Sequence, residues 1–230
     1  MATLPNVVLV HGAWGNASHW NKVILPLQRK GYKVTAVENP LTSLEDDAER
    51  TRKLIAAQDG PVVLVGHSYG GAVITQAGNE PNVKALVYIA AFAPDEGDSL
   101  GSIFAQREAP SGAASIRPDS DGFLWIDREK FHESFSQDLS DDEAELMAAT
   151  QKPIAGRCFE DKSGTPAWKT KPSWYQVSEQ DHMIPPATEQ WMAERMAPKK
   201  IVSLPASHAS LASHPDVVVA LIEEAAGSIH

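Results

Sequence analysis

A serine flanked by glycines stands where an apolar run meets a helical segment. The sequence Gly66-His67-Ser68-Tyr69-Gly70-Gly71 directly follows the apolar run Val62 to Val65. A strand-to-helix turn this sharp strains the backbone of the serine and admits only small residues two positions before and two positions after it. Gly66 and Gly70 occupy those two positions. The pattern predicts that Ser68 Oγ projects above a sheet as a nucleophile, at the positive end of a helix.

A serine hydroxyl is a weak nucleophile at neutral pH and needs a neighbouring base. Among the eight histidines, His208 directly follows the last predicted strand, which places it at the same edge of the sheet as Ser68. Six of the other seven histidines suit different roles: a helix cap for His214, a loop brace for His11, the far side of the turn for His67, and a helix start, the central insertion and the terminus for His19, His132 and His230. We therefore predict that His208 is the base.

The base in turn needs a carboxylate that fixes its tautomer and stabilises its charged form. Asp181 follows the predicted strand Ser173 to Val177, which gives the chain order nucleophile, acid, histidine. Asp95, after the strand Val83 to Ala90, is a competing candidate, and Glu179 is a weaker one. We predict Asp181.

The oxyanion that develops during acyl transfer needs backbone donors. The amide of Tyr69, the residue after the nucleophile, is one expected donor. The loop His11-Gly12-Ala13-Trp14 after the first strand supplies the other, because Gly12 lets it turn inward. We predict that the amide of Ala13 is this second donor.

The rest of the chain supplies the scaffold that these residues require. Six short apolar runs read as buried strands: 7–10, 33–37, 62–65, 83–90, 173–177 and 200–204. Helical patterns separate them at 18–30, 43–58, 69–79, 186–196 and 215–226. This alternation predicts an α/β fold with about six strands in a mostly parallel sheet that helices flank on both faces.

The alternation breaks in the middle of the chain. We expect residues 1–93 and 171–230 to form the core, and residues 94–170, rich in Gly, Pro, Ser and acids, to form a cap or lid. Within this insertion the sequence predicts one helix, 140–151, with Ser140 and Glu143 as a capping box. We expect a largely helical cap over the carboxyl ends of the strands, where such sheets bind ligands.

Aromatic residues are candidates for substrate contacts. We predict that Trp14, Phe123, Trp125 and Trp168 bind the substrate. The insertion also carries Phe131, Phe135 and Phe159. The alternative is that the aromatic residues of the insertion form its own small core.

The composition of the chain limits the classes of molecule that it is expected to bind. The 230 residues carry a formal net charge of -10, which argues against nucleic acid and anionic membranes. The single cysteine, Cys158, suits a small core or cap residue. No group of His, Cys and Asp has metal-ligand spacing, so we expect neither a metal nor another cofactor. Without a basic segment followed by a long apolar one at the N-terminus, we expect a cytoplasmic protein. A homodimer is compatible with the sequence but is not determined by it.

Several segments together resemble a known family. Val8 to Trp14, the Ser68 turn, Trp174-Tyr175, Ile184-Pro185-Pro186 and Ser207-His208-Ala209 resemble the bacterial α/β-hydrolase esterases, which are similar to plant methylesterases and hydroxynitrile lyases. The resemblance spans nearly the whole chain and is weakest in the cap. It implies carboxylesterase activity, no cofactor and a helical lid.

The sequence thus favours a serine hydrolase that cleaves a small apolar or neutral carboxylic ester through an acyl-enzyme. A lactonase on the same residues is the first alternative, and a ligand receptor without turnover is another. Hydroxynitrile lyases of this group carry a threonine and a lysine where this chain has Gly12 and Ala209. Without that cation to stabilise departing cyanide, a lyase is disfavoured.

Overall fold

The computed structural model describes residues 4–229. His230 and the first three residues of the N-terminal segment, from which a cytoplasmic protein is expected, lie outside this range. Six parallel strands form one sheet in the order β2-β1-β3-β4-β8-β9. Their bounds are Asn6–Val10 (β1), Val34–Val37 (β2), Val62–His67 (β3), Val83–Ile89 (β4), Ser173–Ser178 (β8) and Lys200–Leu204 (β9). The predicted parallel sheet is confirmed.

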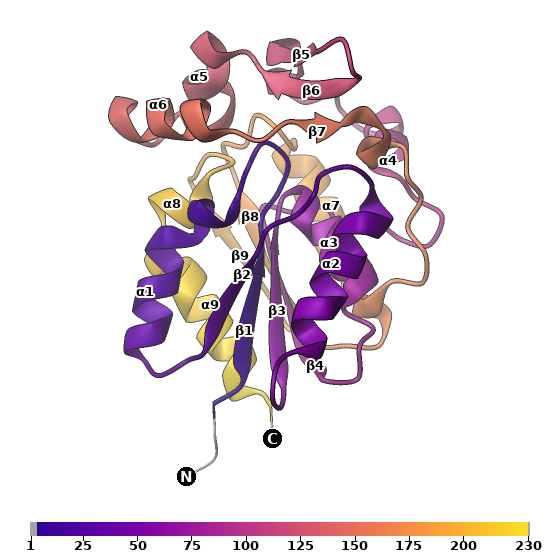
Figure 1. Ribbon diagram of the computed structural model, residues 1–230, viewed down its shortest axis with the longest axis vertical. Coiled ribbons are helices and arrows are strands. Elements are labelled where there is room, and N and C mark those ends of the chain that lie inside the picture. The colour runs from indigo at the N-terminus through magenta and orange to yellow at the C-terminus, as the bar shows by residue number, and fades with distance from the viewer. Residues whose placement is uncertain (1–3, 230) are drawn as a thin grey trace.

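Alternate residues of each strand face opposite layers of the molecule, because strand side chains alternate in direction. In β1, Val7 and Leu9 pack in one apolar cluster, whereas Val8 and Val10 pack in another. Helices α1 (Asn21–Arg29) and α9 (Pro215–Gly227) cover the first face. Helices α2 (Leu44–Ala56), α3 (Tyr69–Ala77) and α7 (Pro186–Met196) cover the second. Figure 1 shows these two layers on either side of the sheet.

The chain between β4 and β8 builds a layer above the carboxyl ends of the strands (Figure 1). It contains the helices α4 (Leu100–Gln106), α5 (Phe131–Phe135) and α6 (Asp141–Thr150). The capping box predicted for α6 is present, since Ser140 and Glu143 exchange hydrogen bonds. The division of the chain into core and cap at 93/94 and 170/171 stays a prediction.

The expectation of a largely helical cap needs a correction. The strands β5 (Ile116–Pro118), β6 (Phe123–Ile126) and β7 (Ile154–Ala155) form a small antiparallel sheet. The turn between β5 and β6 contains Gly122, which has a φ of 82° that a side chain would disfavour. The same segment of the chain contains four short turns of 3-10 helix: η2 (Ser111–Ser115), η3 (Arg128–Lys130), η4 (Gly156–Phe159) and η5 (Ala167–Lys169).

Two short elements flank the site described below. Helix α1 is preceded by η1 (Ala17–Trp20), and α8 (Ser210–Ser213) lies between β9 and α9. Within residues 4–229, no helix has the length and apolar character that crossing a bilayer requires.

Candidate active site

Ser68 stands in a strained turn between β3 and α3. Its φ of 54° lies in the left-handed region, which residues with a side chain rarely adopt. A Cβ on Gly66 would lie 2.5 Å from Gly70 O, and a Cβ on Gly70 would collide with Val10 O. The two glycines are therefore required by close backbone contacts, as the sequence predicts.

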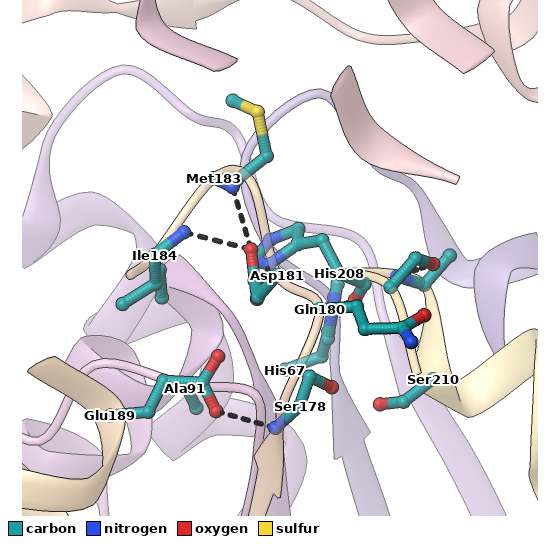
Figure 2. Close-up of polar contacts among 12 residues, drawn as sticks. His67, Ala91, Ser178, Gln180, Asp181, Met183, Ile184, Glu189, His208 and Ser210 are labelled. Carbon is teal, nitrogen blue, oxygen red and sulfur yellow. Dashed lines mark hydrogen bonds and ion pairs between the residues drawn. The ribbon is translucent and has the colours of Figure 1, made fainter. Parts of the chain in front are cut away.

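Asp181 and His208 lie side by side, although 27 positions separate them in the chain. Asp181 follows β8 and His208 follows β9, so the adjacent parallel strands deliver both residues to one edge of the sheet. His208 Nδ1 donates to Asp181 Oδ2 over 2.5 Å. Asp181 Oδ1 accepts from the amides of Met183 (2.6 Å) and Ile184 (2.8 Å), as Figure 2 shows. These bonds fix the carboxylate and leave Nε2 as the basic nitrogen of the neutral ring.

The backbone of His208 is anchored beside the serine. The ring of His67, the residue before Ser68, donates from Nε2 to His208 O over 2.7 Å. The rings of His67 and His208 lie 4.8 Å apart between centroids. His208 Nε2 is buried and makes no hydrogen bond within residues 4–229. Hydrogen bonds between a nucleophile and its base are often long before substrate binds. The sequence suggests only that His67 points away from Ser68, and this supporting contact is not predicted.

The competing acids lie in other surroundings. Asp95 forms an ion pair with Lys169, and both side chains are partly exposed. Glu179 is exposed and its amide donates to Leu204 O. Among the three candidate acids, the structure pairs only Asp181 with His208.

The two predicted oxyanion donors border the same pocket as Ser68. Ala13, Ser68 and Tyr69 all line it. Tyr69 is the first residue of α3, so its amide has no acceptor inside the helix. Gly12 packs against the serine, since a Cβ there would lie 2.6 Å from Ser68 Cβ. The geometry is compatible with the predicted donors, whose role stays a prediction.

His11 braces the loop that carries Ala13, as the sequence suggests. Its Nε2 accepts from Asn39 N over 3.0 Å, and its Nδ1 lies 2.8 Å from Gly12 O. An acceptor Nε2 requires the neutral ring with the proton on Nδ1. Burial agrees with this state, because it lowers the pKa of His11 to about 4.

A buried polar contact also holds Tyr69. Its hydroxyl donates to Asp47 Oδ2 over 2.6 Å, and Leu41 N donates to Asp47 Oδ1 over 2.7 Å. Burial raises the pKa of Asp47 to about 6. Cys158 of η4 is buried beside the same hydroxyl, and burial raises the pKa of its thiol to about 12. Cys158 is thus an inert packing residue between core and cap, in agreement with the sequence.

The pocket that contains Ser68 is narrow and almost entirely apolar. Both the core and the layer above it contribute to its lining: Ala13, Trp14, Phe92, Phe104, Pro110, Ile116, Phe159, Met183 and Ile184, with Ser68 and Tyr69. Its volume of about 20 Å³ leaves room for about one water molecule. An ester must therefore displace lining side chains in order to reach Ser68.

Of the four residues predicted to bind substrate, Trp14 alone belongs to the described lining of this pocket. Trp125 of β6 is partly exposed and donates from its indole to Asp119 Oδ2. Phe123 lies on the same short strand. Trp168 donates to Pro94 O and borders a separate surface cleft with Trp174. The roles of Phe123, Trp125 and Trp168 in substrate binding stay predictions, and aromatic type alone does not indicate which way a side chain points.

Comparison with known proteins agrees with this architecture. The model of the alpha/beta hydrolase family matches residues 7–221. An α/β hydrolase of Aspergillus novofumigatus is 28% identical over 248 residues, which cover 97% of each chain. A pyrethroid hydrolase of Sphingobium wenxiniae is 28% identical over 247 residues, covering 93% of this chain and 85% of that protein.

A solved structure extends the likeness to the fold. The crystal structure of a pyrethroid hydrolase from Sphingobium faniae superposes with a TM-score of 0.85 at 22% identity, covering 99% of each chain. Together with the match of the family model over residues 7–221, this places the chain in the alpha/beta hydrolase family.

Proposed function

We propose that this protein hydrolyses a small neutral carboxylic ester through an acyl-enzyme on Ser68, with His208 as base and Asp181 as the acid that orients it. The observation that carries the proposal is the Ser68 turn, which borders an apolar pocket together with the predicted oxyanion donors. The Asp181–His208 pair lies at the same edge of the sheet. The methylesterases and pyrethroid hydrolase among the relatives support an ester as substrate.

The reaction follows from these positions. His208 Nε2 removes the proton of Ser68 Oγ as the oxygen attacks the ester carbonyl. The amides of Ala13 and Tyr69 stabilise the resulting oxyanion. Protonated His208 then gives its proton to the departing alkoxide, which leaves an acyl-Ser68. Water, deprotonated by His208, attacks this acyl group and releases the carboxylic acid and free Ser68.

The lining of the pocket supports a neutral, apolar substrate. The residues that line the pocket around Ser68 carry no charge, and they include the aromatic residues Trp14, Phe92, Phe104 and Phe159. A charged group would lose its hydration there without gaining a partner.

The surroundings of Gly12 and Ala209 speak against cyanohydrin cleavage. A threonine at Gly12 would place its Cβ 2.6 Å from Ser68 Cβ and 2.9 Å from His67 O, so it could not enter without displacing the nucleophile. Ala209 is buried and offers no cation.

A substrate panel tests the proposal. We expect turnover of p-nitrophenyl acetate or butyrate, and no cleavage of mandelonitrile above the uncatalysed rate. Butyrolactone and an acyl-homoserine lactone in the same panel distinguish an esterase from a lactonase. Clear mandelonitrile turnover with inert esters would overturn the proposal.

A further inference from the structure

A second carboxyl group is buried behind Asp181. Glu189 lies in the first turns of α7 and its side chain is completely buried. Its Oε2 accepts a hydrogen bond of 3.0 Å from the amide of Ser178, at the end of β8 (Figure 2). Its Oε1 is also buried and, within residues 4–229, has no donor. A buried carboxylate oxygen without a donor is costly, so this group requires an explanation.

The Glu189 carboxyl neighbours that of Asp181, whose charge acts on it. Two carboxylates this close, away from water, cannot both be ionised. Asp181 accepts hydrogen bonds from Met183 N, Ile184 N and His208 Nδ1. Among the residues that the structure describes, Glu189 accepts from Ser178 N alone. Because donors stabilise the charged form, the pair keeps its negative charge on Asp181 and its proton on Glu189.

The other neighbours of Glu189 do not change this assignment. The charged or titratable side chains that face it are Asp181 and Tyr175 of β8. The hydroxyl of Tyr175 donates to Ala91 O and is therefore already engaged. Burial, and then the charge of Asp181, raise the pKa of Glu189 well above its ordinary value.

We propose that Glu189 is a positioning residue: as a neutral acid it donates a hydrogen bond to Asp181 and holds this carboxylate in place against His208. The proposal rests on the proposed function, since it assigns Glu189 a role through the Asp181–His208 pair. The proton remains on Glu189 throughout the reaction, so no atom is transferred to substrate.

Two variants distinguish three possible roles of the Glu189 side chain: a neutral hydrogen-bond donor, a negative charge and a packing group. Glu189→Gln retains an amide donor toward Asp181 and an acceptor for Ser178 N, as the neutral acid does. Glu189→Met fills a similar volume without either group. Circular dichroism and thermal unfolding check that both variants fold.

The kinetic readout is the pH profile of kcat/KM for p-nitrophenyl butyrate. Glu189→Gln should stay within about threefold of wild type with an unmoved acidic limb, because it preserves the hydrogen bonds. Glu189→Met should lose about 10- to 100-fold, the usual effect of removing a hydrogen bond to a charged group. Its acidic limb should move to higher pH, since Asp181 without its donor attracts the proton of His208 more strongly.

The spectroscopic readout does not depend on turnover. The infrared spectrum of the wild type at neutral pH should contain the carbonyl band of a protonated carboxyl, and the spectrum of Glu189→Gln should lack it. The difference between the two spectra isolates this band. If the wild type has this band but cleaves no ester, the proposed function fails while the shared proton stands.

Three results would overturn the proposal. The first is the absence of the carbonyl band in the wild type. The second is an equal kinetic loss in Glu189→Gln and Glu189→Met, which would show that a negative charge matters. The third is a folded Glu189→Met variant with wild-type kinetics. If Glu189→Met does not fold, the infrared carbonyl band and the pH profile of Glu189→Gln still test whether Glu189 is a neutral donor.

Discussion

At the scale of single residues, the scaffold fixes the Asp181 carboxylate and the backbone of His208 by hydrogen bonds. Asp181 accepts two backbone amides besides His208 Nδ1, so its carboxylate cannot rotate without losing bonds. His208 is held at its other end by His67, which binds its carbonyl oxygen. Such fixed groups avoid reorganisation at the moment of reaction, which is the main source of electrostatic catalysis.

The first prediction concerns the carboxylate. Asp181→Asn should lower kcat for p-nitrophenyl butyrate by roughly ten-thousand-fold, because an amide stabilises the wrong tautomer of His208 and cannot balance its charged form. Asp95→Asn is the matched control and should retain nearly full activity, since Asp95 pairs with Lys169 instead. Steady-state kinetics on both variants test this. The reverse ranking of the two would move the role of the acid to Asp95.

The sequence predicts some residues of the candidate active site but not Glu189. Ser68, Asp181 and His208 could be selected because each lies within four residues of the carboxyl end of a strand. Glu189 was missed because an acid in the first turn of a helix usually faces water. The available signal was its spacing, since Glu189 shares one helix face with Met192, Ala193 and Met196, all buried.

At the scale of elements, the layer above the sheet determines access to Ser68. Helix α4 contributes Phe104 and η4 contributes Phe159 to the lining of the pocket. Phe104 contacts Phe92 edge to face, with ring centroids 5.3 Å apart, and Phe159 packs against Trp14 at 6.0 Å. These pairs close the pocket with side chains from both layers.

The second prediction follows from that closure. Phe104→Ala should enlarge the pocket, so that kcat/KM for p-nitrophenyl octanoate relative to the acetate rises about tenfold or more. Trp125→Ala, on β6 in the same layer but outside the pocket lining, is the control and should leave the ratio unchanged. Kinetics on a panel of p-nitrophenyl esters of graded chain length give this ratio of kcat/KM values. An equal ratio in Phe104→Ala and wild type would mean that the acyl chain binds elsewhere.

The core elements were predictable from the sequence and the cap sheet was not. Several core strands contain continuous apolar runs that mark buried strands, such as Val7 to Val10 in β1 and Val62 to Val65 in β3. Strand β6 is only four residues long, and its partner β5 contains Pro118. Asp121-Gly122 before β6 is a recognised hairpin signal. The density of Gly, Ser and acids around it is typical of an irregular segment and masks this signal.

At the scale of the whole molecule, buried histidines couple folding to pH. Burial lowers the pKa of His19 to about 3 and that of His11 to about 4, and lowers that of His67 well below its usual value. These histidines are neutral in the folded chain and bind protons below about pH 6.5 when unfolded. The free energy of unfolding should therefore fall as the pH drops from about 6.5 toward 4. Asp47, with its pKa raised to about 6, opposes this trend in part.

The third prediction isolates one histidine. His19→Leu removes one proton from the difference between the folded and unfolded states. The slope of unfolding free energy against pH, between about pH 4 and 6, should therefore decrease by about 1.4 kcal/mol per pH unit. Urea unfolding at a series of pH values gives this slope. An unchanged slope would show that His19 binds its proton equally well in both states.

The central claim is that Ser68 is the nucleophile of an acyl-transfer reaction. The most direct test is to find where a fluorophosphonate attaches, by mass spectrometry of peptides from the treated protein, with Ser68→Ala as the control. The account predicts one adduct on Ser68 in the wild type, none on the folded variant, and a loss of ester turnover in that variant on the order of a million-fold. An adduct on another residue, or ester turnover by Ser68→Ala near the wild-type rate, would contradict it.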